Sequence, residues 1–365
     1  MAKKTTSAVV EKIGEMRLRE YPVPELHADD GLLKVEMVGI CRTDPSIFYG
    51  KVQAGGYPVI LGHEILGRVA AAGDLAAQRW GVQPGDRVIV ENFVPCGFCK
   101  QCRLGHFKHC LHLIGYGTLT NAVAPPHLWG GYGEHMYLAP NSVLHKMPDD
   151  LPAEACALTP SVLANAYEWV HLMGRVQSGD IVVIEGVGQQ GLCATIVARE
   201  CGARTVIVTG LTRDARRFEL ARRFGADYCI DIEKEDLAQT VRDITGGDLA
   251  NVVVEVTGDP RAVSIAADLA APLGTIVAAG LSGTETVTPL FLQKLQFKEL
   301  RLLGVLSSGT EAHTLAANLV RSRKYPIEDI VDQRYGLEEA QQAVETVAGK
   351  VSGLYPSKTV LDLRS

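Results

Sequence analysis

The stretch IVVIEGVGQQG, residues 181–191, joins an apolar segment of strand length to the start of a helix-length amphipathic segment. Its glycines form a G-x-G-x-x-G pattern. Gly186 permits a tight turn, Gly188 lets the backbone approach a pyrophosphate, and Gly191 lets the helix pack on the strand. The free N–H groups of the helix N-terminus would bind the phosphates. Glycines also occur in ordinary strand-to-helix turns, but this context predicts a dinucleotide-binding site.

The alternation of apolar and amphipathic segments continues along the chain. Further apolar runs cover residues 205–209, 228–230, 251–256 and 275–280, and helix-length segments begin near 190 and cover 214–224. Strands that alternate with helices predict βαβ units and a parallel sheet. We therefore expect an α/β domain built on a parallel sheet.

The end of the second predicted strand, Thr209-Gly210-Leu211-Thr212-Arg213, carries no acidic residue. An Asp or Glu there accepts from the ribose 2′-hydroxyl of NAD, and it would repel the 2′-phosphate of NADP. Arg213, Arg216 or Arg217 could pair with that phosphate, although such a run is also typical of a solvated helix face. We expect a nicotinamide cofactor, NAD or NADP, with a preference for NADP. Replacing Gly210 by Asp is expected to shift the preference towards NAD.

The first half of the chain, up to about residue 155, is rich in Gly and Pro. Its short β-like runs cover 32–38, 87–91 and the surroundings of Tyr137, and turn signals separate them. Many short strands with frequent turns predict a barrel or a sandwich. The C-terminal tail shows helical patterns near 311–322 and 337–348, then a strand-like KTVLDL. Periodicity alone does not assign this tail to either half.

Four cysteines, Cys96, Cys99, Cys102 and Cys110, have the spacing C-x2-C-x2-C-x7-C. Thiolates two residues apart can bind one tetrahedral Zn²⁺, and this lobe, about residues 93–112, has too few apolar side chains to form its own core. Disulfides or chance clustering are the alternatives. The spacing favours a structural zinc.

The composition limits the possible functions. The chain has 365 residues, of which 47% are hydrophobic and 21% charged, and a net charge of −6. This length suggests two domains. We expect no membrane span and no signal peptide, because no apolar stretch approaches about 20 residues and the N-terminus lacks an apolar core. The acidic balance argues against nucleic acid as a partner, and the scattered remaining cysteines fit a reducing, cytoplasmic environment.

Two further motifs carry candidate ligands for a second metal. Cys41, Thr43 and Asp44 lie in GICRTD, and His63 and Glu64 lie in GHEILG. A catalytic zinc needs about three protein ligands and an open position, and Cys41 and His63 suit it. Asp44 is placed to accept from the second ring nitrogen of His63. A lone Cys or His is usually inert, but here the two occur in a matching pair of motifs.

The motifs GICRTD, GHEILGRVAAAG, PGDRV, the four-cysteine lobe, GGYGEH and GVGQQG occur together and in this order. With them the chain resembles the zinc-dependent medium-chain dehydrogenases, such as alcohol, sorbitol and threonine dehydrogenases, over essentially its full length. The resemblance implies a GroES-like β-barrel from residues 1–160 and 305–365 and a Rossmann domain from residues 161–304. It also implies a catalytic zinc between the domains, and homodimers or homotetramers.

The resemblance implies roles for individual residues. Cys41 and His63 would bind the catalytic zinc, and Glu64 would lie behind it within reach. Thr43 would pass on the alcohol proton, and Arg42 would contact the cofactor pyrophosphate. Aromatic candidates for the substrate wall, equally compatible with a core position, are Phe48, Tyr49 and Trp129.

Two positions depart from the family pattern. Where many relatives have a proton-relaying His, this chain has the segment 45–48, so the relay would end at Ser46 or use cofactor ribose hydroxyls and water. Where relatives supply a third zinc ligand, this chain has Ser161, and a neutral hydroxyl is a poor ligand. The third ligand is then Glu64, a water or, with a shifted alignment, Cys156 or Glu154.

Together these features predict an enzyme that transfers hydride reversibly between a small secondary alcohol or polyol and NAD(P). Two other functions fit parts of the pattern. One is a zinc-free reductase on the same fold, although such relatives generally lack the cysteine lobe and the Cys41–His63 pair. The other is a dinucleotide-binding protein without turnover.

Overall fold

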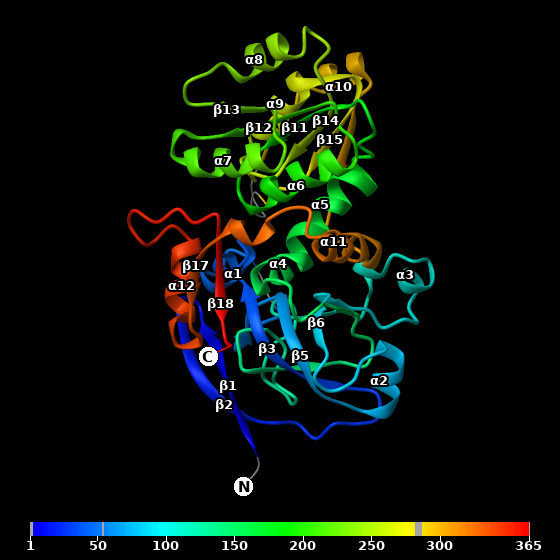
Figure 1. Ribbon diagram of the computed structural model, residues 1–365, viewed down its shortest axis with the longest axis vertical. Helices are drawn as coiled ribbons and strands as arrows, with labels where there is room; N and C mark the ends of the chain where they lie inside the picture. Colours follow the sequence, from blue (N-terminus) through cyan, green and yellow to red (C-terminus); the bar gives the residue numbers. More distant parts are fainter. Residues whose placement is uncertain (1–2, 53–54, 282–286, 365) are drawn as a thin grey trace. The chain divides into compact units, whose positions relative to one another are not determined.

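The computed structural model describes residues 3–52, 55–281 and 287–364. The chain forms two compact units (Figure 1). The first consists of Met1–Ser161 and Gly309–Ser365, and the second of Val162–Ser308. The second unit is thus one continuous segment inserted between the two parts of the first.

The second unit is built on a parallel six-stranded sheet with the order β13-β12-β11-β14-β15-β16. Its strands are β11 (Ile181–Glu185), β12 (Thr205–Gly210), β13 (Tyr228–Asp231), β14 (Ala250–Glu255), β15 (Ala270–Ala278) and β16 (Arg301–Gly304). All residues of β11 are buried, as expected for a central strand covered on both faces. The sheet order reverses between β11 and β14, and ligands of such sheets bind beyond the carboxyl ends of the strands at this point.

Helices cover both faces of this sheet. They are α5 (Ala164–Ala166), the π-helical η3 (Tyr167–Met173), α6 (Gln189–Glu200), η4 (Thr212–Asp214), α7 (Ala215–Arg223), α8 (Leu237–Ile244), α9 (Ala262–Leu269) and α10 (Leu292–Lys298). Figure 1 shows α6 and α7 on one side of the sheet and α8, α9 and α10 on the other. This is a doubly wound arrangement.

The first unit is mainly antiparallel. Its strands are β1 (Lys4–Lys12), β2 (Glu15–Pro22), β3 (Gly31–Gly39), β4 (Val59–Ile60), β5 (Glu64–Ala72), β6 (Arg87–Val90), β7 (Phe93–Val94), β8 (Ile114–Gly115), β9 (His135–Leu138), β10 (Leu144–Lys146), β17 (Val331–Tyr335) and β18 (Lys358–Asp362). Its helices are α1 (Thr43–Phe48), α2 (Asp74–Trp80), α3 (Lys100–Arg103), η1 (Phe107–His109), α4 (Ala153–Ala157), α11 (Thr310–Ser322), η5 (Ile327–Ile330), η6 (Leu337–Glu339) and α12 (Ala340–Val347). The segment η2 (Thr159–Leu163) is kinked at Pro160 and Ser161, whose backbone angles are not helical, and the chain passes from the first unit to the second within it.

The C-terminal tail belongs to the first unit. A seven-stranded sheet follows the order β10-β6-β5-β3-β18-β17, with β9 also paired to β3. The last strand, β18, lies between β3 and β17, so residues from opposite ends of the chain become neighbours. This sheet and the β2-β1-β4 sheet enclose one apolar core. Within the described ranges, no helix combines the length and apolarity needed to cross a bilayer.

Candidate active site

Two adjacent strand ends bring the candidate zinc ligands together. Cys41 follows the end of β3, and His63 and Glu64 lie at the start of β5, which pairs antiparallel with β3 so that Gly39 lies opposite Glu64. The three potential ligand atoms all lie within 4.8 Å of one another. Cys41 is half-buried, and His63 and Glu64 are buried.

Asp44 lies next to both Cys41 and His63. Its Oδ2 accepts a hydrogen bond from the Cys41 backbone N–H at 2.7 Å, and its Oδ1 lies 3.5 Å from His63 Nδ1. Burial alone would lower the pKa of His63, but the Asp44 carboxylate raises it, and the pKa lies well above its ordinary value. Since Nδ1 faces Asp44, Nε2 is the ring nitrogen left for a metal.

Glu64 has two differently placed carboxylate oxygens. Oε2 accepts from the ammonium group of Lys358, which also donates to the Ile40 carbonyl at 3.1 Å. Oε1 is buried and has no hydrogen-bond partner among the residues described. A buried carboxylate in one cluster with a thiol and an imidazole matches the donor set of a zinc site.

Two residues of this neighbourhood were missed by the sequence reasoning. One is Lys358, a fully buried cation at the start of β18, and a buried cation is itself a signal that a buried anion is nearby. The other is Tyr132, from the motif GGYGEH. Burial raises the pKa of Tyr132 well above its ordinary value, and the nearby Asp44 and Glu64 carboxylates raise it further.

The structure separates the candidates for the third ligand. Ser161 adopts a left-handed backbone conformation with φ of 57°, and its hydroxyl donates to the His63 carbonyl at 3.5 Å. Glu154 instead forms an ion pair with Arg334 at 3.0 Å. Cys156 is fully buried on α4, where burial raises its pKa to about 11. Glu64 is therefore the candidate that joins the metal-ligating cluster.

The proton path and the aromatic residues are placed as follows. Cys41 Sγ lies 3.7 Å from the Thr43 hydroxyl, and the Ser46 hydroxyl donates to the Arg42 carbonyl at 3.0 Å. Phe48 is 1% exposed and belongs to the core of the first unit, so of the two positions left open by the sequence it takes the core position. Tyr49 and Trp129 are partly buried and pack against the same core.

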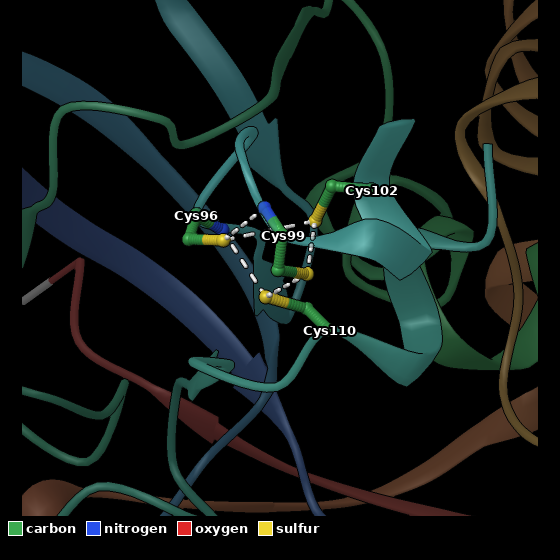
Figure 2. Close-up of side chains that lie close together, drawn as sticks. All are labelled: Cys96, Cys99, Cys102 and Cys110. Atoms are coloured by element: carbon green, nitrogen blue, oxygen red, sulfur yellow. Dashed lines mark hydrogen bonds between the residues drawn. The ribbon is translucent and has the colours of Figure 1, made fainter. Parts of the chain in front are cut away.

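The four cysteines converge around α3. Figure 2 shows their sulfur atoms turned towards one another. Cys99 Sγ lies 3.5 Å from Cys102 Sγ and 3.9 Å from Cys110 Sγ, and Cys96 Sγ lies 3.9 Å from Cys102 Sγ. Four sulfurs at about 2.3 Å from a tetrahedral Zn²⁺ lie about 3.8 Å apart, so the lobe fits zinc. Backbone N–H groups of Cys102 and Leu111 lower the pKa of Cys99 to about 6, which favours the thiolate.

The dinucleotide loop lies at the carboxyl end of β11. Gly186 has a φ of 108°, and a Cβ added at Gly188, which directly precedes α6, would meet no atom within 4 Å. A Cβ at Gly191 would overlap the carbonyl oxygen of Gly186. Gly191 is thus required mainly because helix α6 lies so close to the turn at Gly186. The expected approach of the helix to the strand is a weaker constraint, since the added Cβ would lie 3.5 Å from Ile184 Cγ2.

Two buried carboxyl groups lie near this loop. Glu185 directly precedes it, and Glu255 lies at the end of the neighbouring strand β14. Glu185 and Glu255 are in-register neighbours at the ends of β11 and β14. Glu255 accepts from the N–H groups of Thr257 and Gly258 at 2.6 and 2.9 Å. Burial, together with the Glu255 charge, raises the pKa of Glu185 well above its ordinary value.

The tip of β12 is closed around Gly210. A Cβ there would lie 2.7 Å from Val187 Cγ1 and 2.9 Å from the Phe218 ring. The expected effect of Gly210→Asp therefore needs correction, because steric strain would accompany the new charge. Arg217 pairs with Asp214 at 2.6 Å, and Arg213 lies exposed on η4.

Comparisons with known proteins identify the family. The family pattern described as alcohol dehydrogenase GroES-like domain matches residues 27–149, and that of zinc-binding dehydrogenase matches residues 191–322. A probable alcohol dehydrogenase of Mycobacterium tuberculosis is 40% identical over 97% of each chain, and D-arabitol-phosphate dehydrogenase of Enterococcus avium is 31% identical over 91% of each. A zinc-binding dehydrogenase of Sinorhizobium meliloti, solved with NADP, has a TM-score of 0.86 and 29% identity over 99% of both chains. The chain therefore belongs to the zinc-type medium-chain alcohol dehydrogenases, oxidoreductases that act on CH–OH groups with a nicotinamide cofactor.

Proposed function

We propose that Cys41, His63 and Glu64 bind a catalytic zinc in this enzyme. The supporting observation is that three ligand atoms from adjacent strand ends lie within 4.8 Å of one another. Glu64 Oε1, buried and without a hydrogen-bond partner in the described part of the chain, is the atom that a cation would satisfy. Because position 161 is a serine, Glu64 supplies the third protein ligand.

The chain's own groups serve distinct tasks in this proposal. Bound zinc would supply Lewis-acid polarisation of the alcohol oxygen, and the nicotinamide would accept the hydride. The Thr43 hydroxyl takes the alcohol proton and passes it towards solvent, with Ser46 or water as the next acceptor. Asp44 keeps His63 in one orientation, and the exposed Arg42 contacts the pyrophosphate.

The proposed substrate is a small secondary alcohol or a polyol. The motifs resemble those of sorbitol and threonine dehydrogenases, and one relative is named for a phosphorylated polyol. We further propose NADP as the preferred cofactor, because the tip of β12 lacks an acid, Arg213 lies close by in the chain, and one similar structure contains NADP. A panel of alcohols assayed with both cofactors tests both proposals.

The remaining proposals concern assembly and location. We propose a homodimer or homotetramer in which a second copy pairs along the outer edge of β16. Leu302 on this strand and Leu306 just after it are 38% and 48% exposed. None of the nine cysteines, all of which lie in the described part of the chain, forms a disulfide, which supports a reducing compartment such as the cytoplasm.

Metal analysis combined with turnover tests the catalytic site. The parent chain is expected to hold two zinc ions, and Cys41→Ala or His63→Ala one, with turnover abolished and the fold intact by circular dichroism. Cys201→Ala, outside both cysteine-containing sites, is the matched control and should keep both ions. Near-normal turnover of His63→Ala would remove zinc from the chemistry.

A further inference from the structure

Two buried carboxyl groups lie side by side at the base of the dinucleotide loop. Glu185 ends β11 and Glu255 ends β14, and these residues are 3% and 1% exposed. The two strands are parallel and pair in register here, so both side chains point to the same face of the sheet. The sheet order reverses between these strands, which is where ligands of such sheets bind.

The two carboxyl groups differ in their hydrogen bonds. Glu255 Oε1 accepts from the Thr257 N–H at 2.6 Å, from the Thr257 hydroxyl at 2.5 Å and from the Gly258 N–H at 2.9 Å. Three donors stabilise the ionised form of a carboxyl group. Glu185 Oε2 is buried and has no hydrogen-bond partner among the residues that the structure describes. The surroundings therefore favour a negative charge on Glu255 and a proton on Glu185.

The charged groups around the pair support this distribution. Burial raises the pKa of Glu185 well above its ordinary value, and the Glu255 charge raises it further. The strands β12 and β15, which flank the pair, carry no charged side chain. The remaining charged groups on the elements packed against β11 and β14 are Arg199 and Glu200 in the last turn of α6, Asp268 near the end of α9, and the Asp259–Arg261 ion pair in the loop after β14.

The pair adjoins the dinucleotide loop on two sides. Glu185 directly precedes Gly186, the first glycine of the loop. A Cβ added at Gly186 would lie 2.9 Å from Thr257 Cγ2, so the Thr257 side chain, which Glu255 holds, packs against this glycine. The loop leads into α6, whose free N–H groups would bind the pyrophosphate. The carboxyl pair therefore acts on the anion site both along the chain and across the sheet.

We propose that Glu185 and Glu255 share one proton and that the cofactor pyrophosphate binds to this protonated pair. A second negative charge in the pair would repel the phosphates, and it would also push Glu255 and Thr257 away from Gly186. Cofactor affinity is therefore highest while Glu185 holds its proton, and it falls as rising pH removes that proton. Above this point, binding takes up a proton from the solvent. The effect depends neither on the catalytic zinc nor on the choice between NAD and NADP.

Binding of ADP-ribose to the full chain, measured by calorimetry from mildly acidic to mildly alkaline pH, tests the proposal. This probe carries the pyrophosphate, whose charge is constant over that range, and it lacks the nicotinamide. The dissociation constant of the parent should rise with pH and approach about tenfold per pH unit once Glu185 ionises. Glu185→Gln, which stays neutral, should keep its affinity throughout. Titrations in buffers of different ionisation enthalpy should detect proton uptake in the parent and none in Glu185→Gln.

A control and a second variant complete the test. Asp248→Asn removes an exposed carboxyl group just before β14, at the end of the strand opposite Glu255, and should behave like the parent. Glu185→Met, also neutral, replaces Glu185→Gln if circular dichroism shows that the latter is unfolded. A dissociation constant of the parent that does not change with pH would overturn the proposal. An equal rise, or equal proton uptake, in the parent and the neutral variant would also overturn it, because another group would then titrate.

Discussion

At the scale of single residues, the cofactor site shows how packing limits charge. Gly210 has no room for a side chain beside Val187 and Phe218, so an acid that recognises the ribose of NAD cannot enter there without displacing its neighbours. Packing at the tip of β12 is therefore the reason why position 210 carries no carboxylate. We therefore expect the choice between NAD and NADP to depend on the cations that follow on η4 and α7.

We predict that Arg213→Ala lowers kcat/KM for NADP by about 10–100-fold and leaves the value for NAD nearly unchanged. The reason is the loss of one charge-assisted hydrogen bond to the 2′-phosphate, worth about 1.5–3 kcal/mol. Steady-state kinetics with both cofactors check this. Arg204→Ala is the control. Arg204 precedes the opposite end of β12, and its Nη2 lies 3.7 Å from Asp248 Oδ2. Equal losses with both cofactors would contradict the assignment.

At the scale of elements, we expect the four-cysteine lobe to depend on a bound zinc. Around α3 and η1 few side chains are buried, so metal–sulfur bonds would supply much of the folding energy of the lobe. Cys99→Ser should therefore remove one zinc and lower the unfolding temperature. Metal analysis and thermal unfolding measure both effects. Cys229→Ser, outside the lobe, should keep both zinc ions, and an unchanged zinc content of Cys99→Ser would exclude the structural site.

The adjacent strands β11 and β14 predict a pH dependence of stability. Because the pKa of Glu185 is raised in the folded protein, the folded state keeps a proton that the unfolded state loses above the ordinary value of 4.5. Stability should therefore fall as the pH rises from about that value towards the raised pKa, by up to about 1.4 kcal/mol per pH unit. Glu185→Gln should flatten this slope. Urea unfolding at several pH values measures it, and an unchanged slope would contradict the shared burial of the two carboxyl groups.

At the scale of the whole molecule, the free edge of β16 is the proposed site of self-association. An unpaired edge strand with exposed apolar side chains readily pairs with another copy. Leu302→Lys should reduce the mass in solution, measured by light scattering, to that of a single chain. Leu18→Lys, at a 46% exposed position on β2, is the control. An oligomer that persists in Leu302→Lys would place the interface elsewhere.

Much of the architecture could be read from local patterns in the sequence. The strand at 181–185 has the bounds of β11, and the helix predicted at 214–224 is α7 at Ala215–Arg223. The Rossmann and GroES-like fold classes and the enzyme class are confirmed by the family matches. Periodicity and turn chemistry act over a few residues, so such elements are legible without the tertiary structure.

The sequence alone determined the features that depend on short spacing: the phosphate loop, the four-cysteine lobe and the Cys41–His63 motifs. Only the tertiary structure decided which distant groups meet. It placed Lys358 on Glu64, buried Phe48 in the core and closed the space at Gly210. The physical reason is that these contacts join strands and helices far apart in the chain. They are fixed by packing and burial, on which local sequence patterns carry no information.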